Sequence, residues 1–327
     1  MSDVPANIFE QQAANRRKTI LVMAFFVLFV GFLGFGFDVF LLGFSPGGRA
    51  FPGFPVATFA ALILGGVSAY RGLENGARSV LNSSGAVPAP PEDPRYRQLH
   101  NVVEEMAIAA GLPKPQVCVI PDPDPNAFAT GKDPEHATIA VTQGLLDSLD
   151  REELQGVIAH EMGHVRNFDI RLMTVIAALI GAVMLLVEFG SRSMQFGGLG
   201  RGGRRSSSNR SGGGVVLLVF WVIGLILAPF ISQLLAMAVS RQRELLADAS
   251  GAELTRNPGA LASALQKIDA AVEPTRSIKR GTAHLCIANP LGSSLDDREG
   301  FFADLFSTHP PIRKRRMLLK AMAYQHA

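Results

Sequence analysis

Cysteine is nearly absent from this chain of 327 residues, which contains only Cys118 and Cys286. The two lie far apart and form no CxxC pair, so the sequence predicts neither a thiolate zinc site nor a disulfide framework. Both are expected to be small buried hydrophobic residues, which fits a reducing compartment.

Charged residues are also scarce, at 18% of the chain, whereas apolar residues make up 48% and the mean hydropathy is +0.23. Such values are high for a soluble domain and indicate that part of the chain lies in a lipid bilayer. The net charge is only +3, with a pI of about 9.0, so a nucleic-acid partner is not expected. Basic residues beside membrane segments account for this balance, and the length allows more than one folding unit.

Two apolar segments near the N-terminus predict a transmembrane hairpin within residues 1–80. Residues 19–37, TILVMAFFVLFVGFLGFGF, follow the basic run RRK and are too long for a signal-peptide core. They therefore predict a retained membrane helix. Residues 54–70 form the second segment, after a short turn rich in Gly and Pro.

Two further apolar segments, residues 172–187 and 215–239, predict a second hairpin within residues 171–239. The first of them is short for a full span, so a buried soluble helical hairpin is the alternative. The charge-free run VVLLVFWVIGLILAPFI in the second favours membrane. The connecting loop 190–214 is rich in Gly, Arg and Ser, and a flexible connector is favoured over an RGG-like RNA contact.

Basic residues beside the first two segments predict their orientation. Residues 16–18, RRK, precede the first segment, and Arg71 and Arg78 follow the second, whereas only Arg49 lies in the turn. The positive-inside rule then places the N-terminus, and the chain after Arg71, in the cytoplasm. The arginines of loop 190–214 disagree with this rule if both later segments span, so a re-entrant hairpin is the other possibility for them.

Residues 81–170 and 240–327 are expected to form one α+β domain, mostly helical with a small sheet, which the second hairpin interrupts. The predicted elements are a helix over residues 97–110, strands at PQVCVI and HATIAVT, a short helix at QGLLDSL, a helix begun by the Asp150–Glu153 capping box, a helix begun by Asn257-Pro258, and a last helix near THPP.

The motif HEMGH lies in the helix that follows this capping box. Residues four apart on an α-helix lie about 40° apart around its axis and about 6 Å apart along it, so His160 and His164 can bind one metal ion. Zinc fits, because it accepts neutral imidazole and keeps a water when the protein supplies three ligands. Glu161 is poorly placed to bind the ion but can reach that water, as general base and proton shuttle. Gly163 leaves space for substrate or a neighbouring strand.

A third ligand must come from farther along the chain, because Asn167 and Ile170 break the pattern HExxHxxGxxH. Glu244, in SRQRELLADASGAE, is the best candidate, and Asp248 lies on the same helical face one turn later. Asp248 is expected to accept the second ring N–H of a ligand histidine, which fixes the tautomer and raises the basicity of the ring.

Other interpretations of these residues remain open at this point. Asp169 is either a ligand or, preferably, a local hydrogen-bond partner, and His284 and His309 are less favoured ligands. A pair of structural histidines would also explain HEMGH, and a solvated charged face would explain Glu244 and Asp248. Three further histidines are expected at the surface: His100, His136 and His326.

Both ligand helices are expected to emerge from the same side of the second hairpin. Continuous helices would place Leu172 about 12 Å from His164, and Glu244 about 7 Å from Val239. The site is therefore expected within roughly 10–15 Å of the lipid interface. A membrane protein or one of its loops is the expected substrate.

Four stretches together resemble the HtpX family of integral-membrane zinc metalloproteases, which is related to the CAAX prenyl proteases: AHEMGHVRNFDI, SRQRELLADASGAEL, NAFATG and STHPPIRKR. The resemblance covers nearly the whole chain, with four hydrophobic segments in the same order. It implies a gluzincin-like domain in which His160, His164 and Glu244 bind one zinc ion and Glu161 is catalytic. It also implies quality control of membrane or misfolded proteins, under stress, in the bacterial inner membrane.

The resemblance assigns roles to further residues. NAFATG matches an edge strand of the family, which would bind substrate backbone through three residues: Asn126, Ala127 and Phe128. A plain turn and strand is the alternative. The late motif HPP makes His309 and Arg315 candidates for steadying the oxyanion or the surroundings of Asp248, with a helix N-cap as the alternative for His309. The chain departs from the family in loop 190–214 and in RELLAD, where an aromatic residue is expected.

Two functions of different classes compete. In the first, a zinc endopeptidase acts on membrane-associated proteins, zinc polarises the scissile carbonyl, and Glu161 activates a zinc-bound water. In the second, a non-catalytic membrane adaptor holds a structural metal. Structural zinc sites usually have four protein ligands, often cysteine, and neither cysteine lies near the motif. An acid also follows the first histidine, so the endopeptidase is predicted.

Overall fold

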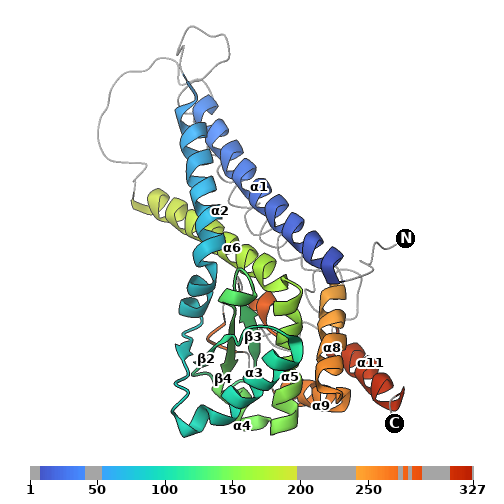
Figure 1. Cartoon of the computed structure of the whole chain (residues 1–327). Coiled ribbons are helices and arrows are strands. Elements are labelled where there is room, and N and C mark those ends of the chain that lie inside the picture. Colours follow the sequence, from blue (N-terminus) through green and yellow to red (C-terminus); the bar gives the residue numbers. More distant parts are fainter. Residues whose placement is uncertain are drawn as a thin grey trace, which may run out of the picture. The chain divides into compact units, whose positions relative to one another are not determined.

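The computed structural model describes residues 8–40, 54–196, 241–271, 275–278, 282–288 and 310–325. Over these residues the fold is mostly helical, with one small mixed sheet (Figure 1). The fourth apolar segment, most of loop 190–214, His309 and His326 lie outside the described residues.

Most of the predicted elements are present, with the following bounds. The helices are α1 (Ile8–Phe40), α2 (Val56–Ser83), α3 (Arg97–Ala110), α4 (Gln143–Ser148), α5 (Arg151–Arg166), α6 (Asp169–Phe196), α8 (Arg241–Thr255), α9 (Pro258–Asp269) and α11 (Ile312–Gln325). Short 3-10 turns are η1 (Pro94–Tyr96), η2 (Pro134–His136) and η3 (Ala283–Leu285). The strands are β1 (Val87–Pro88), β2 (Gln116–Ile120), β3 (Ala127–Thr130) and β4 (Thr138–Thr142).

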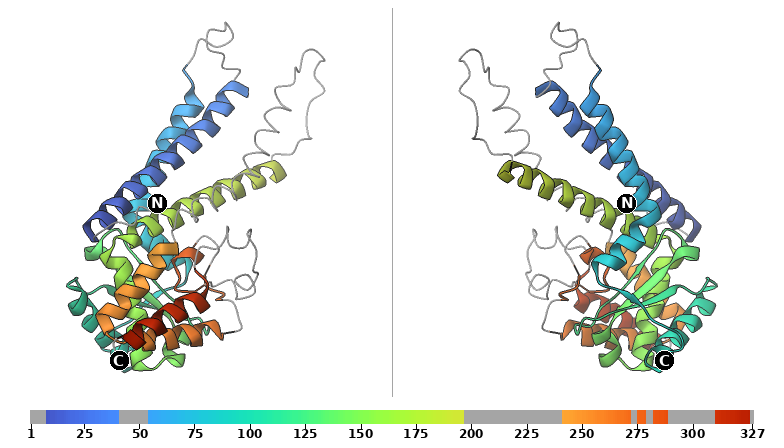
Figure 2. Two further views of the ribbon diagram at one scale, coloured as in Figure 1. Left: turned by 90° about the vertical axis from the view of Figure 1, so that its right-hand side faces the viewer. Right: turned by 90° about the vertical axis from the view of Figure 1, so that its left-hand side faces the viewer.

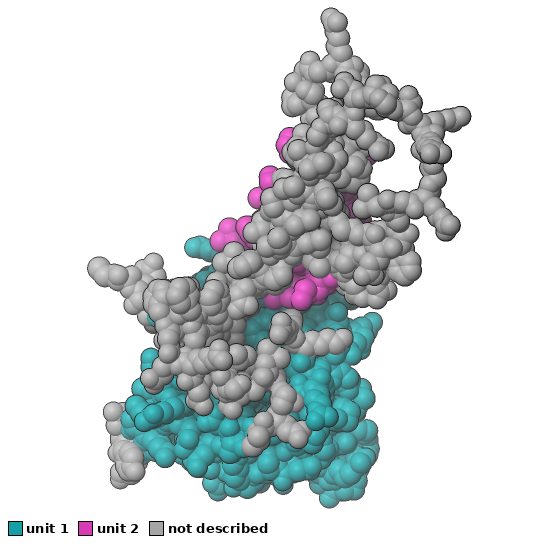
Figure 3. All heavy atoms as spheres, turned by 180° about the vertical axis from the view of Figure 1, so that it is seen from behind, with its two compact units in different colours: residues 1–19, 73–178, 236–327 teal, residues 20–72, 179–235 magenta. Residues whose placement is uncertain are grey.

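The chain divides into two compact units, which Figure 3 shows in different colours. Unit 1 consists of Met1–Thr19, Leu73–Ala178 and Ala236–Ala327, and unit 2 consists of Ile20–Gly72 and Leu179–Leu235. The long helices α1, α2 and α6 each contribute residues to both units. HEMGH and the residues predicted to act with it belong to unit 1.

Two helices are long and apolar enough to cross a membrane, Glu10–Gly36 within α1 and Val56–Ser83, which is α2. They contain the first two predicted segments, and many of their large apolar side chains are exposed: Ile20, Leu21, Leu28, Phe32, Ile63 and Leu64. A third candidate span arises only if α5 and α6 are counted together. The chain is therefore a membrane protein with two clear candidate spans among the described residues.

Within unit 2, α1 and α2 lie side by side as an antiparallel pair (Figures 1 and 2). A Cβ added to Gly34 would lie 2.6 Å from both the Ala57 carbonyl oxygen and the Ala61 Cβ, so this glycine allows the helices to approach closely. Asp38 accepts hydrogen bonds from the backbone N–H groups of Ala57 at 2.9 Å and Thr58 at 2.7 Å, both in the first turn of α2. The carboxylate thereby caps the N-terminus of α2.

The helix of HEMGH does not run on into residues 172–187, so that prediction is wrong. Helix α5 ends at Arg166 and α6 begins at Asp169, with a bend of 84° between the two. Phe168, in the break, has φ 58°, a left-handed conformation that a right-handed helix cannot include. The spacing expected between His164 and Leu172 along one continuous helix therefore does not apply.

The sheet belongs to unit 1 and has the strand order β1-β2-β4-β3. Strands β2 and β4 are parallel, with Cys118 opposite Ala140, whereas β3 is antiparallel to β4, with Phe128 opposite Ala140. NAFATG therefore forms an edge strand. Both cysteines are buried and unbridged, as the sequence predicts.

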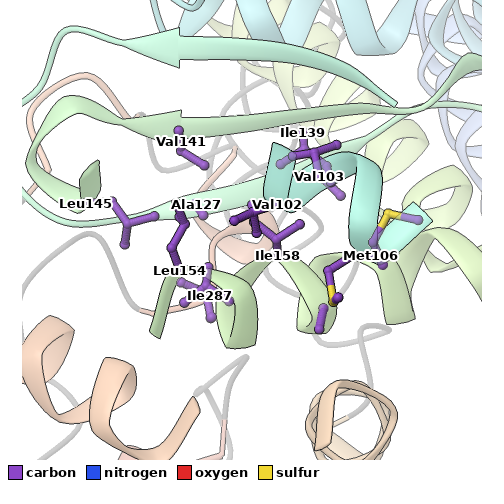
Figure 4. Packing of buried hydrophobic residues seen from close by; sticks show 14 of the residues in the cluster. Val102, Val103, Met106, Ala127, Ile139, Val141, Leu145, Leu154, Ile158 and Ile287 are labelled. Atoms are coloured by element: carbon purple, nitrogen blue, oxygen red, sulfur yellow. The ribbon is translucent and has the colours of Figure 1, made fainter. Parts of the chain in front are cut away.

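The hydrophobic core of unit 1 lies between the sheet and the helices α3 and α5 (Figure 4). The side chains that meet there include Val102, Val103 and Met106 of α3, Ile139 and Val141 of β4, and Leu154 and Ile158 of α5. Each such side chain contributes about 1.5–3 kcal/mol when it is fully buried. The core thus fixes α5 against the sheet.

The predicted capping box begins α5. The Glu153 N–H donates to Asp150 Oδ1 at 2.9 Å, and the Asp150 N–H donates to Glu153 Oε2 at 2.9 Å. Glu153 also accepts hydrogen bonds from Lys267 Nζ at 2.6 Å and Ser263 Oγ at 2.7 Å, both on α9. Burial acts to raise the pKa of Glu153, but the bonds from Lys267 and Asp150 outweigh it and lower that pKa. The first turn of α5 is thereby tied to α9.

Candidate metal centre

Three buried donors from two helices meet in unit 1. His160 and His164 of α5 and Glu244 of α8 each offer one ligand atom, and these atoms lie within 4.8 Å of one another. Glu244 Oε2 is 3.7 Å from His160 Nε2, and Glu244 Oε1 is 3.5 Å from His164 Nε2. A tetrahedral zinc ion with bonds of about 2.0–2.1 Å separates its ligands by about 3.4 Å. The spacing therefore suits three donors around one small ion.

The chemistry of these donors also fits a divalent metal. His160 Nε2 is buried and has no hydrogen-bond partner within the described part of the chain. Buried polar atoms of this kind are normally satisfied, so a bound ion is a reasonable partner for it. Two imidazoles and one carboxylate form a donor set that zinc accepts, and three protein ligands leave one position for water or substrate.

Close packing of α8 on α5 brings Glu244 to the two imidazoles. A Cβ added to Gly163 would lie 3.2 Å from the Ser250 Cβ and 3.3 Å from the Ala247 Cα. A Cβ added to Gly251 would lie 3.1 Å from the backbone nitrogen of His160. The neighbour of Gly163 is therefore a helix, and the expectation of a strand or substrate there is wrong.

Behind His160 lie Asp248 and Arg315. Asp248 Oδ1 is 2.9 Å from His160 Nδ1, which is the contact predicted for this aspartate. Arg315 donates from Nη2 to Asp248 Oδ1 at 2.7 Å and from Nε to Asp248 Oδ2 at 2.8 Å. Burial acts to raise the pKa of Asp248, but the Arg315 charge outweighs it and lowers that pKa to about 2. The pKa of His160 is lowered by burial, which favours the neutral ring that a metal requires.

Behind His164 lies Asp169, whose Oδ2 is 3.0 Å from His164 Nδ1. Of the two roles open to Asp169, the structure shows hydrogen bonding. Burial acts to lower the pKa of His164, but the bond to Asp169 and the Glu244 charge outweigh it and raise that pKa to about 9. Metal binding at Nε2 must therefore displace a proton from this ring.

Glu161 is 1% exposed, and neither carboxylate oxygen accepts a hydrogen bond of normal geometry from the described residues. Burial raises the pKa of Glu161 to about 7. The backbone N–H of Ala129 acts in the opposite direction on this pKa, so the outer edge of β3 lies beside Glu161. A carboxyl group that titrates near neutrality is suited to general-base catalysis.

The edge strand β3 presents alternate residues to β4 and to the outside. The Thr142 N–H donates to the Asn126 carbonyl at 2.9 Å, so Asn126 pairs with β4. Because hydrogen-bonded pairs alternate in an antiparallel ladder, Phe128 also faces β4, whereas Ala127 and Ala129 face outward. The backbone of β3 next to Glu161 is therefore that of Ala129, one residue beyond the three predicted to bind substrate.

The segment after η3 covers one end of the outer edge of β3. The Ile287 N–H donates to the Ala127 carbonyl at 2.9 Å, and the Ile287 carbonyl accepts from Arg315 Nη1 at 2.7 Å. The Asn126 side chain also reaches this segment, with Nδ2 3.3 Å from the Ala288 carbonyl oxygen. The Asn126 side chain and the Ala127 carbonyl are thus already hydrogen-bonded to residues of the same chain.

Of the remaining histidines, none that the structure describes approaches the three donors. His284 Nε2 lies 3.1 Å from the Met173 carbonyl, and the ligand group does not include it. The expectation that His100 lies at the surface is wrong, because it is buried and its Nε2 is 2.9 Å from the Ala89 carbonyl. His136 is exposed, as predicted.

Two residues at the site are not among those that the sequence predicts. Asn15 of α1 donates from Nδ2 to Asp169 Oδ1 at 2.6 Å, and Arg243 Nη1 lies 3.6 Å from the same oxygen. Arg243 could have been considered, since it directly precedes Glu244. No motif or periodicity signals Asn15.

The chain is similar to several known proteins. The model of Peptidase family M48 matches residues 93–323. A "Protease HtpX homolog" of Caldanaerobacter subterraneus subsp. tengcongensis is 45% identical over 315 residues, which cover 96% of this chain and 98% of the relative. One of Ligilactobacillus salivarius is 41% identical over 308 residues, covering 94% and 97%. The crystal structure of S. mikatae Ste24p aligns with 17% identity and a TM-score of 0.47, over 95% of this chain and 67% of that one.

Proposed function

Because this chain belongs to the HtpX group of peptidase family M48 and is a metalloprotease, we propose that it is a zinc-dependent endopeptidase of membrane or misfolded proteins. The observation that carries the proposal is the meeting of His160, His164 and Glu244 beside the buried carboxyl group of Glu161. One zinc ion per chain would be held by these three donors.

In the proposed mechanism, each residue of the site has a separate task. When bound, zinc supplies a positive charge that polarises the scissile carbonyl and makes water more acidic. Glu161 accepts the proton of the attacking water and delivers it to the nitrogen of the leaving amine. Asp248 and Asp169 accept the Nδ1 protons of the two histidines, so that both Nε2 atoms are available on the side of Glu244.

The substrate is proposed to bind as an extended strand along the outer edge of β3. Since Ile287 already occupies the Ala127 carbonyl, pairing centres on the backbone of Ala129. Asn126 and Phe128 then support the strand without contacting substrate. This placement sets the scissile bond beside Glu161.

Arg315 was predicted to steady either the oxyanion or Asp248, and its bonds to both oxygens of Asp248 support the second role. His309 stays the candidate for the oxyanion. Membership of a peptidase family argues against the alternative of a non-catalytic adaptor.

The cellular role is part of the same proposal. The chain is proposed to span the bacterial inner membrane several times, with hairpins in residues 1–80 and 171–239 and a protease domain formed by residues 81–170 and 240–327. The basic residues 16–18 and Arg71 favour an active site on the cytoplasmic side. Quality control under stress, on membrane or unfolded substrates, fits this placement.

The test compares three forms of the full chain purified in detergent, namely the native protein, Glu161→Gln and the chelated native protein, with casein as substrate. Glu161→Gln is expected to keep one zinc per chain by atomic absorption and to lose at least about a hundred-fold in turnover, because a general base is missing. Chelation should abolish turnover, and added zinc should restore it. Equal turnover by all three forms would remove the hydrolase mechanism.

A further inference from the structure

The first helix reaches the metal centre, although the matched family region begins only at residue 93. Residues 8–19 of α1 precede the first apolar segment and belong to unit 1, like the metal centre. Among them, Asn15 is 2% exposed and is buried against the break between α5 and α6. Its Nδ2 donates to the Asn167 carbonyl at 2.9 Å and to Asp169 Oδ1 at 2.6 Å.

These contacts form a chain from α1 to a proposed ligand. Asn15 donates to one oxygen of Asp169, and the other oxygen of Asp169 lies 3.0 Å from His164 Nδ1. Arg243 is the other donor near Asp169, at 3.6 Å, which is beyond hydrogen-bonding distance. Apart from His164 itself, the amide of Asn15 is therefore the hydrogen-bond donor that holds the Asp169 carboxylate in place, among the residues that the structure describes.

Neighbouring residues of α1 contact the same break without touching Asp169. Gln12 Nε2 donates to the Arg166 carbonyl at 2.8 Å, and the guanidinium of Arg16 lies 4.6 Å from the centre of the Phe168 ring. Gln12 thus satisfies a carbonyl at the end of α5, as a C-capping side chain does. Like Asn15, Gln12 carries a carboxamide that donates to a backbone carbonyl at the end of α5, but it makes no bond to Asp169.

We propose that Asn15 is a positioning residue of the metal centre, which makes the start of the first membrane helix part of the catalytic apparatus. Asn15 acts through Asp169, whose fixed carboxylate holds the His164 ring with Nε2 toward Glu244. Residues that hydrogen-bond a ligand histidine, as Asp169 does, typically change metal affinity by about 10–100-fold when they are removed, and Asn15 acts one bond farther out. The inference rests on the metal site proposed above.

The experiment measures zinc affinity of the full chain in detergent, by competition with a chromophoric chelator. Asn15→Ala is expected to weaken zinc binding about ten-fold or more, because Asp169 loses its donor. Asn15→Asp keeps the shape but sets a second negative charge beside Asp169, so its loss should exceed that of Asn15→Ala. Gln12→Ala should stay within about two-fold of native, since it leaves Asp169 untouched. The visible spectrum of the cobalt-substituted protein should change in the Asn15 variants alone.

Melting temperatures with EDTA and with zinc separate positioning from general stability. A purely structural role lowers both temperatures equally and leaves the rise produced by zinc the same as in the native protein. The positioning role instead reduces the rise in melting temperature that zinc produces. If Asn15→Ala does not fold, the zinc affinity of Asn15→Asp is compared with that of Gln12→Ala to decide whether Asn15 has a positioning role.

Two negative results have different meanings. Native affinity and an unchanged cobalt spectrum in both Asn15 variants would overturn the role of Asn15, while the proposed function stands. A native chain that binds no zinc would instead overturn the proposed function, and the inference with it.

Discussion

The two histidines of the metal centre are supported unequally, although both lie on α5 and each has an aspartate behind it. On the His160 side, Arg315 donates to both oxygens of Asp248, at 2.7 and 2.8 Å. On the His164 side, Asp169 has the neutral amide of Asn15 at 2.6 Å and a guanidinium only at 3.6 Å. One side thus depends on a buried, hydrogen-bonded ion pair, and the other on a hydrogen bond from the first helix beside a longer ion pair to Arg243.

One metal site therefore combines two kinds of support for its histidines, a charged guanidinium behind one aspartate and a neutral amide behind the other. Burial acts to lower the pKa of Arg315, but the Asp248 charge outweighs it and raises that pKa, so each partner keeps the other ionised. Breaking such a buried pair leaves an uncompensated charge. Removing a neutral donor leaves only a carboxylate with more freedom, so damage on the two sides should differ in size and in kind.

The largest expected effect is the loss of stability in Arg315→Met. Asp248 would remain buried without its cation, which costs about 3–5 kcal/mol in the free energy of unfolding. Arg243→Met should cost less, because Arg243 Nη1 lies 3.6 Å from Asp169 Oδ1 without a hydrogen bond and Asp169 keeps the Asn15 amide as a donor. Denaturant or thermal unfolding of both variants with saturating zinc provides the measurement. Equal losses would show that the two sides are alike.

Replacing each aspartate by asparagine sharpens the comparison. Both Asp248→Asn and Asp169→Asn should weaken zinc binding by about 10–100-fold, since each removes the anion behind a ligand histidine. Asp248→Asn should also destabilise the metal-free protein, and by more than Asp169→Asn does, because Arg315 loses two hydrogen bonds and its charge partner whereas Arg243 loses only an ion pair at 3.6 Å. Chelator competition and melting in EDTA measure the two quantities separately. A stability loss of the same size in Asp169→Asn would contradict the distinction.

A smaller effect is expected when a side chain is added where α5 and α8 are in close contact. The Cβ of Gly163→Ala would press on the Ala247 Cα at 3.3 Å, which we expect to cost about 1–3 kcal/mol and to move Glu244 away from His164. Zinc affinity should fall together with melting temperature. Gly66→Ala in α2 is the control, because its Cβ would meet no described atom within 4 Å. Unchanged zinc affinity in Gly163→Ala would show that α8 can adjust without moving its ligand.

The smallest effect extends the comparison to the far end of α5, where Glu153 has no contact with the metal centre. Because the pKa of Glu153 is lowered from its ordinary 4.5, its contribution to stability is complete above pH 4.5 and is lost as the pH falls through the lowered value. Glu153→Gln should therefore be about 1 kcal/mol less stable than native at pH 7. Thermal melts across pH should show this gap closing below pH 4.5, with zinc affinity at pH 7 unchanged. A gap that persists in acid would exclude this ionisation as its cause.

Local patterns in the sequence predicted the parts of the site that depend on helix geometry. The spacing of His160 and His164, the capping box at Asp150, and the turn between Glu244 and Asp248 all follow from a period of 3.6 residues. The structure has each of these features. They need no knowledge of distant contacts.

The remaining parts depend on contacts between distant segments, which leave no periodic signal. The break at Phe168 arises from a left-handed backbone at a residue that is not glycine, and nothing near it in the sequence indicates this. Asn15 meets Asp169 across 154 positions through a single hydrogen bond. The outward position of Ala129 could not be predicted without the register of β3 against β4, because hydrogen-bonded pairs alternate along the ladder and so decide which residues face outward.

Asp38 has a consequence for how the first hairpin tolerates change. Its carboxylate accepts hydrogen bonds from two backbone N–H groups and the hydroxyl of Thr58, so one side chain sets the register of α1 against α2. The alignment of the two helices is thereby tied to one acid near the C-terminal end of α1. Shifting Asp38 by a single position would rotate the acid toward lipid, where an unsatisfied carboxylate is costly.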